Sequence, residues 1–383
     1  MDSAFCLHNA TLLTGFSIMP GCAVYIKNNR IADVYNEAQF KQKPFAKQVN
    51  MIDLHGAYIA PGFIDTHIHG IGGYSTDEAD PSSLLKMSEI LPHYGVTSFI
   101  PTINAAPENV LMKRIKAIVS AIGKEKGARI LGIHLEGPFL SPEKIGGQEM
   151  GGLSPVDLSY FKRLVKVGKG HIINMTLAPE LKYIRELSLK CMEEGIVLQA
   201  GHTNATYEQI IEGMQVGIFH ATHMFNAMRP MHHREPGTVG AILTHPEISC
   251  EIIGDGIHVH PDLIRLLTQC KQPNQLVLIT DSLKYTKSKI PENIDLDCDQ
   301  CFRRKSDHVI MGSCITMLDG FHNLLKFGIR LERAIQMATV NPARIMKQQR
   351  IGSIIPSYDA DLLVLDRDFN LKMTMIKGKF LKK

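Results

Sequence analysis

Residues 58–69 read YIAPGFIDTHIH, an apolar run that ends in Asp65, His67 and His69. Such a run is typical of a buried strand whose polar end carries the chemistry. Side chains alternate across a strand, so His67 and His69 point the same way and could bind one metal ion or two adjacent ions. We therefore expect this stretch to be the first strand of a sheet with a metal-binding edge.

Seven further apolar runs follow, separated by helical stretches with apolar residues at i, i+3 and i+4, such as 107–122 and 261–270. Alternating strands and helices are the signature of βα units around a parallel sheet. Eight units predict an α/β protein, a (β/α)8 TIM barrel completed by a helical stretch at 318–346. The expected strands are 58–67, 96–101, 130–135, 172–177, 196–200, 218–222, 249–253 and 276–280.

Both ends of the chain carry short alternating segments typical of β-strands, including runs at 360–366 and 371–381. Neither end is long enough to bury a good core alone. We therefore expect a small β-sandwich domain formed by residues 1–56 together with 350–383, and a catalytic barrel formed by residues 57–349.

The composition is that of an ordinary globular enzyme, with 383 residues, 44% hydrophobic and 21% charged. No stretch approaches the roughly 18 uninterrupted apolar residues of a membrane span, and the start lacks the pattern of a secretory signal. We therefore expect a cytoplasmic protein with no membrane partner. The formal charge of +4 is spread along the chain, so it does not indicate binding to nucleic acid.

Eight cysteines scattered over this length are typical of reduced, mostly buried thiols and not of a disulfide framework. Cys298 and Cys301 form one CxxC pair, a spacing found in zinc sites. Without a second pair or a nearby histidine this spacing does not by itself indicate zinc, so we expect two ordinary thiols.

Metal-binding and acid–base residues gather where six of the eight expected strands end. In a TIM barrel these C-terminal ends form the mouth where the chemistry takes place. Unpaired buried charges are costly, so six such ends indicate a metal site more than packing. Imidazoles with one or two carboxylates suit zinc or iron(II) and leave a position for water. The motifs are Asp65-Thr66-His67-Ile68-His69, His134-Leu135-Glu136, Gly201-His202-Thr203, Thr222-His223, Asp255-Gly256-Ile257-His258 and Thr280-Asp281-Ser282.

Asp281 ends the eighth expected strand, where it can take a proton from water and deliver it to the leaving nitrogen of an amide. Other polar residues have structural interpretations. Asp65 is expected to orient a histidine, and His134 to pack one layer below the ligands. If His223 faces the mouth, strand alternation turns His220 toward the outer helices as a packing residue.

These motifs resemble two nested families. Residues 61–69 resemble the amidohydrolase superfamily in general, and seven further motifs resemble the N-acetylglucosamine-6-phosphate deacetylases in particular. The motifs occur in order over nearly the whole chain. The seven are HLEGPF (134–139), AGHTNA (200–205), THMFNAM (222–228), REPG (234–237), DGIH (255–258), LITD (278–281) and GSCITM (312–317).

The resemblance implies hydrolysis of the acetamide of N-acetylglucosamine 6-phosphate, or of a close relative such as N-acetylgalactosamine 6-phosphate, in amino-sugar recycling. It implies that Glu136, His202 and His223 hold the principal metal, with Asp281 as general base and acid. His258 would stabilise the carbonyl oxygen as it gains charge. Some family members lack the histidine pair of the first strand and use one metal; this chain keeps His67 and His69, so two ions are possible. The implied substrate contacts are Gly147, Gln148, Asn226, Ala227, Met311, Gly312, His258 and Arg234.

Arg234 is implied to bind the 6-phosphate from the neighbouring subunit, which makes a homodimer the expected assembly. Its planar guanidinium is suited to that contact. This chain departs from the family in a second segment that the resemblance links to phosphate binding. The family has a Lys-Gly-Ala-His run whose histidine helps bind phosphate, whereas residues 144–148 read KIGGQ. Gln148 can donate a hydrogen bond but carries no charge. Phosphate recognition is expected to be weaker or rearranged, with Arg229, His232 or His233 as candidates to compensate, so the exact sugar stays open.

Two alternatives remain at this point. Cyclic amidohydrolases resemble the chain at its first strand, but they use a carboxylated lysine at the end of the fourth, where this chain reads TLAPE at 176–180. A catalytically silent scaffold is the other alternative. It would be expected to have lost metal ligands or the aspartate, and this chain keeps them.

Overall fold

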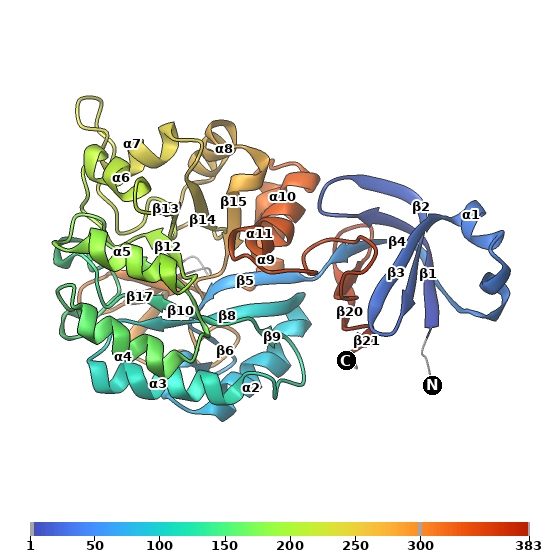
Figure 1. The fold of residues 1–383 in the computed structure, drawn as a ribbon. Coiled ribbons are helices and arrows are strands. Elements are labelled where there is room, and N and C mark those ends of the chain that lie inside the picture. Colours follow the sequence, from blue (N-terminus) through green and yellow to red (C-terminus); the bar gives the residue numbers. More distant parts are fainter. Residues whose placement is uncertain (1–3, 298–300, 382–383) are drawn as a thin grey trace.

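The computed structural model describes residues 4–297 and 301–381 and consists of a barrel beside a smaller β domain (Figure 1). The barrel strands are β5 (Phe63–Ile68), β8 (Val96–Asn104), β10 (Ile133–Glu136), β11 (Ile172–Leu177), β12 (Val197–Ala200), β13 (Ile218–Ala221), β14 (Ser249–Ile253) and β15 (Leu276–Ile279). They are hydrogen-bonded in this order, all parallel. The N–H of Asp281, just after β15, donates to the carbonyl of His67 in β5 at 2.9 Å, which brings the last strand against the first. The predicted TIM barrel is confirmed.

Helices surround the barrel (Figure 1). In α4, Asp157 caps the start by accepting from the backbone N–H groups of Ser159 and Tyr160, and the side chains of Tyr160, Phe161 and Leu164 are buried on one face. Within the described ranges, no helix is long and apolar enough to cross a bilayer. The helices between strands are α2 (Pro81–Ile90), α3 (Glu108–Ala121), α4 (Leu158–Gly168), α5 (Ile184–Glu193), α6 (Tyr207–Met214), α7 (Gly237–Thr244) and α8 (Pro261–Cys270).

The helical stretch expected at 318–346 is broken into α9 (Met317–Lys326), α10 (Leu331–Ala338) and α11 (Val340–Ile345). Gly328, which lies just after the end of α9, adopts a left-handed φ of +84°, a conformation that costs glycine little and ends the helix. The periodic apolar pattern continues across these breaks, and for that reason the sequence predicted one helical stretch instead of three helices.

The smaller domain contains strands from both ends of the chain, as predicted. Its strands lie on one hydrogen-bonded path, β21-β20-β19-β4-β1-β2-β3, which joins the strands of both termini into a mainly β domain. Its main core combines N-terminal side chains such as Leu7 and Val24 with C-terminal ones such as Val364 and Met375. The elements are β1 (Ala4–Leu13), β2 (Ile18–Lys27), β3 (Arg30–Asn36), α1 (Glu37–Lys41), β4 (Asn50–Pro61), β19 (Leu362–Leu365), β20 (Leu371–Ile376) and β21 (Lys379–Phe380).

A three-stranded antiparallel sheet between β15 and α9 was not predicted. It comprises β16 (Ile294–Asp297), β17 (Cys301–Arg304) and β18 (Ile310–Ser313). The N–H of Ser313 donates to the carbonyl of Asp281 at 2.9 Å, which ties this sheet to the barrel mouth. Cys301 is buried in β17, and Cys298 lies outside the described residues. The remaining short strands are β6 (Gly70–Ile71), β7 (Tyr74–Ser75) and β9 (Arg129–Ile130).

Candidate functional site

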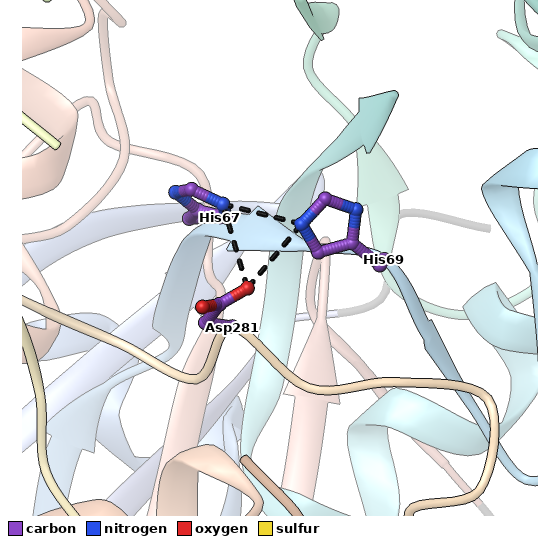
Figure 2. A group of neighbouring side chains, drawn as sticks. All are labelled: His67, His69 and Asp281. Atoms are coloured by element: carbon purple, nitrogen blue, oxygen red, sulfur yellow. Dashed lines mark hydrogen bonds and ion pairs between the residues drawn. The ribbon is translucent and has the colours of Figure 1, made fainter. Parts of the chain in front are cut away.

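His67, His69 and Asp281 form one of two clusters of potential metal ligands at the barrel mouth. Figure 2 shows their nitrogen and oxygen atoms directed at one another. The Nε2 atoms of the two histidines lie 3.3 Å apart, and Oδ1 of Asp281 lies 3.5 Å from His67 and 3.3 Å from His69. Ligand atoms around a tetrahedral ion with bonds of about 2.0–2.1 Å are separated by about 3.4 Å. The cluster therefore fits a divalent cation.

Glu136, His202 and His223 form the second cluster. Oε1 of Glu136 lies 3.1 Å from Nε2 of His202 and 3.0 Å from Nε2 of His223, and these two nitrogens are 3.2 Å apart. Two imidazole nitrogens facing each other around one carboxylate oxygen are likewise the arrangement expected of metal ligands. All three side chains are buried, so water cannot screen them.

Glu136 also joins the two clusters. Its Oε2 lies 3.4 Å from Nε2 of His69, and its Oε1 lies 3.6 Å from Nε2 of His67. Burial opposes ionisation of Glu136, but the facing imidazoles, His67 first among them, outweigh it and hold the pKa of the carboxyl well below its usual range. The residues present therefore fit two adjacent divalent ions with a shared carboxylate, as well as a single ion.

Three of these side chains depend on unusual backbone. His202, His223 and Asp281 have left-handed φ angles of +45°, +27° and +49°. Non-glycine residues rarely adopt such angles, and they persist where the surroundings determine the chain path. Here the N–H of Asp281 donates to the carbonyl of His67, and that of Asn226 to the carbonyl of His223. Sharp turns at the strand ends thus aim the ligands into the mouth.

The left-handed turn at His223 corrects the expectation for His220. His220 does not face the outer helices, because its Nε2 lies 3.8 Å from Oε1 of Glu251 and its Nδ1 lies 2.8 Å from Oγ of Ser249. Side chains alternate along β13 as expected, but the left-handed turn after the strand places His223 on the same side of the sheet as His220. His220 still belongs to neither ligand cluster.

Glu251, in the middle of β14, is a buried residue that the sequence analysis missed. Its Oε2 lies 3.1 Å from Nδ1 of His67, and its Oε1 accepts from the amide of Gln199 at 3.2 Å. A carboxylate behind a ligand histidine fixes the ring's orientation and tautomer. Burial raises the pKa of Glu251, but the neighbouring imidazoles of His220 and His67 outweigh it and hold the pKa far below its usual range. The signal was a lone acid in a strand that reads SCEII and has no other charged residue.

Asp65 does not orient a histidine ring, contrary to expectation. Its Oδ2 accepts from Oγ1 of Thr280 at 2.6 Å and its Oδ1 from the backbone N–H of His67 at 3.4 Å, so it ties β15 to β5. Burial raises the pKa of Asp65 to about 7. His134 packs below the ligands, as predicted, between Oγ1 of Thr102 and Oγ1 of Thr176, and burial lowers its pKa to about 3.

A cavity of about 260 Å³ opens above the two clusters. Gly312 lies behind it, against the carbonyl of Asp281, where a Cβ atom would come within 2.4 Å of that oxygen. Arg234 does not line the cavity; it lies on an exposed loop, with Nη1 2.8 Å from Nε2 of His233. The implied substrate contacts that do line the cavity are Gly147, Gln148, Asn226, Ala227, His258 and Met311.

Asp255 holds the ring of His258. Asp255 was placed in the DGIH motif from the sequence but was given no role. Nδ1 of His258 lies 2.5 Å from Oδ2 of Asp255, whose other oxygen accepts from the backbone N–H groups of Ile257 and His258. The Nε2 atom of His258 is buried and has no hydrogen-bond partner among the described residues. A buried polar atom without a partner is costly, which points to a polar group of a ligand as its partner.

Comparison with known proteins places this site in a family. The model of the amidohydrolase family matches residues 58–381, so the chain belongs to that family. The N-acetylglucosamine-6-phosphate deacetylase of Bacillus subtilis is 33% identical over 99% of this chain and 97% of its own. At that identity and coverage, the chain is a member of the N-acetylglucosamine-6-phosphate deacetylase family.

Solved structures agree over almost the entire length. A mutant N-acetyl-D-glucosamine-6-phosphate deacetylase from Mycobacterium smegmatis, solved in complex with N-acetyl-D-glucosamine-6-phosphate, has a TM-score of 0.90 at 30% identity, covering 99% of both chains. The Pasteurella multocida N-acetylglucosamine-6-phosphate deacetylase has a TM-score of 0.91 at 28% identity, covering 99% of this chain and 100% of its own.

Proposed function

We propose that this chain hydrolyses the acetamide of N-acetyl-D-glucosamine 6-phosphate to glucosamine 6-phosphate and acetate, in amino-sugar catabolism. The observation that carries the proposal is the buried carboxylate of Glu136 between two pairs of histidines, with Asp281 beside them. An amide is a poor electrophile, and this ligand set suits the ion that its hydrolysis needs. The whole-length likeness to N-acetylglucosamine-6-phosphate deacetylases supports the choice of the acetyl group and of the sugar.

Glu136, His202 and His223 would hold the principal ion, and His67, His69 and Asp281 a second one. Mixed imidazole and carboxylate ligands favour zinc or iron(II). When bound, such an ion supplies a water of lowered pKa and polarises the acetyl carbonyl.

Asp281 moves the proton. Burial raises the pKa of its carboxyl, but His67 and His69 outweigh that effect and lower it, so the carboxylate is ready to accept a proton. It takes one proton from the attacking water as the new C–O bond forms and gives it to the nitrogen as the C–N bond breaks, which leaves a free amine and acetic acid that ionises to acetate. His258 donates the N–H of Nε2 to the acetyl oxygen as that atom gains charge.

The sugar phosphate would occupy the cavity above the ligands, against Gly147, Asn226, Ala227, Met311 and Gly312. Neither lysine nor arginine lines this cavity in the described ranges, although a phosphate needs a cation or several donors. We propose that Arg234 supplies the cation from the neighbouring subunit of a homodimer. We also propose a cytoplasmic location, since a charged sugar phosphate does not cross a membrane unaided.

The test is acetate release across a panel of N-acetylglucosamine and N-acetylgalactosamine, each with and without the 6-phosphate, before and after treatment with a chelator. We expect the fastest release from N-acetylglucosamine 6-phosphate, loss with chelator and recovery with zinc or iron(II). Faster release from the galactosamine compound would reassign the sugar. No release from any member would favour a catalytically silent scaffold. A cyclic amide is assayed beside the panel, and opening of its ring would favour a cyclic amidohydrolase.

A further inference from the structure

Gln148 reaches the metal ligands with its side chain. It is 7% exposed and lies on the loop between β10 and α4, where its Nε2 donates to Oε2 of Glu136 at 2.6 Å and to Oδ1 of Asn104 at 3.1 Å. Its Oε1 accepts from the backbone N–H of Ala105 at 2.9 Å. Both amide hydrogens are therefore engaged within the protein.

The orientation of this amide is fixed by its neighbours. A backbone N–H can only donate, so the oxygen of Gln148 must face Ala105 and its nitrogen must face Glu136. Asn104 is fixed in the same way, because its Nδ2 donates to Oδ2 of Asp77 at 2.9 Å and leaves its oxygen for Gln148. Asp77 is paired with Arg114 of α3, from Oδ1 to Nη1 at 3.0 Å.

These contacts form one directed chain from a surface helix to the carboxylate shared by both ligand clusters. Arg114 pairs with Asp77, Asp77 accepts from Asn104, Asn104 accepts from Gln148, and Gln148 donates to Glu136. Reversing any amide would place two donors or two acceptors against each other. This series of hydrogen bonds therefore holds Oε2 of Glu136 against the amide of Gln148.

The same loop holds a second ligand. Nδ1 of His202 lies 2.9 Å from the carbonyl oxygen of Lys144, and a carbonyl can only accept, so this ring nitrogen carries the proton. Nε2 of His202 is then the atom that is free to bind an ion. Residues 144–148 thus orient two of the three ligands of the principal cluster.

We propose that Gln148 is a positioning residue that sets the carboxylate of Glu136 for metal binding, and that its amide is not a contact to the sugar phosphate. Oε1 of Glu136 faces His202 and His223, while Oε2 is held by the amide near His69. A neutral amide donor does this without competing with the metal ion for the carboxylate, as the ammonium group of a lysine would. Partners of this kind commonly change metal affinity by about 10–100-fold when removed.

The first test compares Gln148→Met, which keeps length and removes the donor, with Glu149→Gln, a change at the exposed neighbouring position. The readout is the dissociation constant for Zn²⁺, measured by competition with a chromophoric chelator, together with thermal unfolding of the metal-free proteins. We expect Gln148→Met to bind Zn²⁺ about 10–100-fold more weakly, with little change in metal-free unfolding, and Glu149→Gln to match the unaltered protein.

Unchanged Zn²⁺ affinity with a raised KM for the phosphorylated substrate would overturn the proposal in favour of a sugar contact. A metal-free protein that unfolds at a much lower temperature would overturn it in favour of a packing role. Should Gln148→Met fail to fold, Asn104→Ala tests the same chain one step away. This variant removes the hydrogen bond from Gln148 to Asn104 without altering Gln148 itself. Unchanged Zn²⁺ affinity in Asn104→Ala would contradict the proposed series of hydrogen bonds.

A double-mutant cycle shows whether Asn104 and Gln148 act through one series of hydrogen bonds or independently of each other. If Asn104 acts through Gln148, the losses in Zn²⁺ affinity of Asn104→Ala and Gln148→Met do not add, whereas additive losses overturn the shared route. The inference rests on the proposed function only in taking the ligand set as a metal site. Metal affinity needs no amide substrate, so an error in the sugar or the reaction leaves these outcomes readable.

Discussion

The carboxylate of Glu251 lies 3.1 Å from Nδ1 of His67, while Nε2 of the same ring faces the mouth of the barrel. Both side chains are fully buried. One ring nitrogen is thereby given a hydrogen-bond acceptor, and the other is left as a ligand atom. The barrel interior below the two ligand clusters is therefore part of the proposed metal site.

Glu251→Gln is expected to weaken binding of a second ion at His67, His69 and Asp281 by about tenfold or more, because a neutral amide fixes the ring less firmly. Elemental analysis after dialysis against graded chelator measures this loss. Glu247→Gln, at a side chain that is 58% exposed just before the same strand, is the matched control. Equal metal content in both variants would show that Glu251 is only a packing residue.

Asp281→Asn is expected to fold and to keep the ion held by Glu136, His202 and His223, yet lose about 10²–10⁴-fold in kcat, because an amide cannot shuttle the proton. Acetate release at saturating substrate measures the loss, and metal analysis of the same sample verifies the remaining ion. Near-normal turnover would remove Asp281 from the proton transfer.

Metal affinity and metal-free stability are expected to respond to pH in opposite directions. Burial alone would lower the pKa of His69, but the carboxylates of Asp281 and Glu136 raise it from 6.5 to about 9 in the absence of an ion. A raised pKa stabilises the metal-free fold fully below pH 6.5, and this contribution is lost as the pH rises to about 9. An ion needs the neutral ring, so its affinity rises over the same interval.

Zn²⁺ titrations and metal-free melting curves at about pH 6.5, 7.5 and 8.5 measure both trends. The expected gain in affinity is at most about tenfold per pH unit for each proton displaced. Affinity that is flat across this range would contradict a protonated His69 in the metal-free protein.

Arg234→Ala is expected to raise KM for the 6-phosphate substrate by about 10-fold or more while leaving the unphosphorylated sugar unaffected, since a charged hydrogen bond contributes about 1.5–3 kcal/mol. Steady-state kinetics on the two substrates gives the comparison. Mixing Arg234→Ala with Asp281→Asn chains then tests the dimer: activity regained in mixed dimers is expected only if the arginine acts across subunits.

The barrel and the two clusters of candidate metal ligands could be predicted because both rest on short-range patterns. β15 reads LVLI and is buried throughout, as a strand covered on both faces must be. His67 and His69 share one side by alternation, and the candidate ligands lie at the ends of strands or just after them. No relation between distant residues had to be known to find them.

The remaining features depend on geometry that a pattern does not contain. The left-handed turn at His223 broke the alternation used for His220, and nothing in Asp65 distinguished a backbone contact from a contact to a ring. From the sequence, Gln148 could be compared only with the family's phosphate-binding histidine, and that comparison did not indicate a contact with Glu136. Its contact with Glu136 arises because the loop after β10 folds back over the mouth.

The pairing of β4 with β19 has a consequence for how the chain is made. Pro61 is opposite Leu362, so one edge of β4 has no neighbour until the last part of the chain has been synthesised. At about 5–20 residues per second, that edge stays open on the ribosome for roughly 15–60 s. A nascent chain that stalls in this interval exposes an unpaired strand to other polypeptides, which makes early termination a route to aggregation.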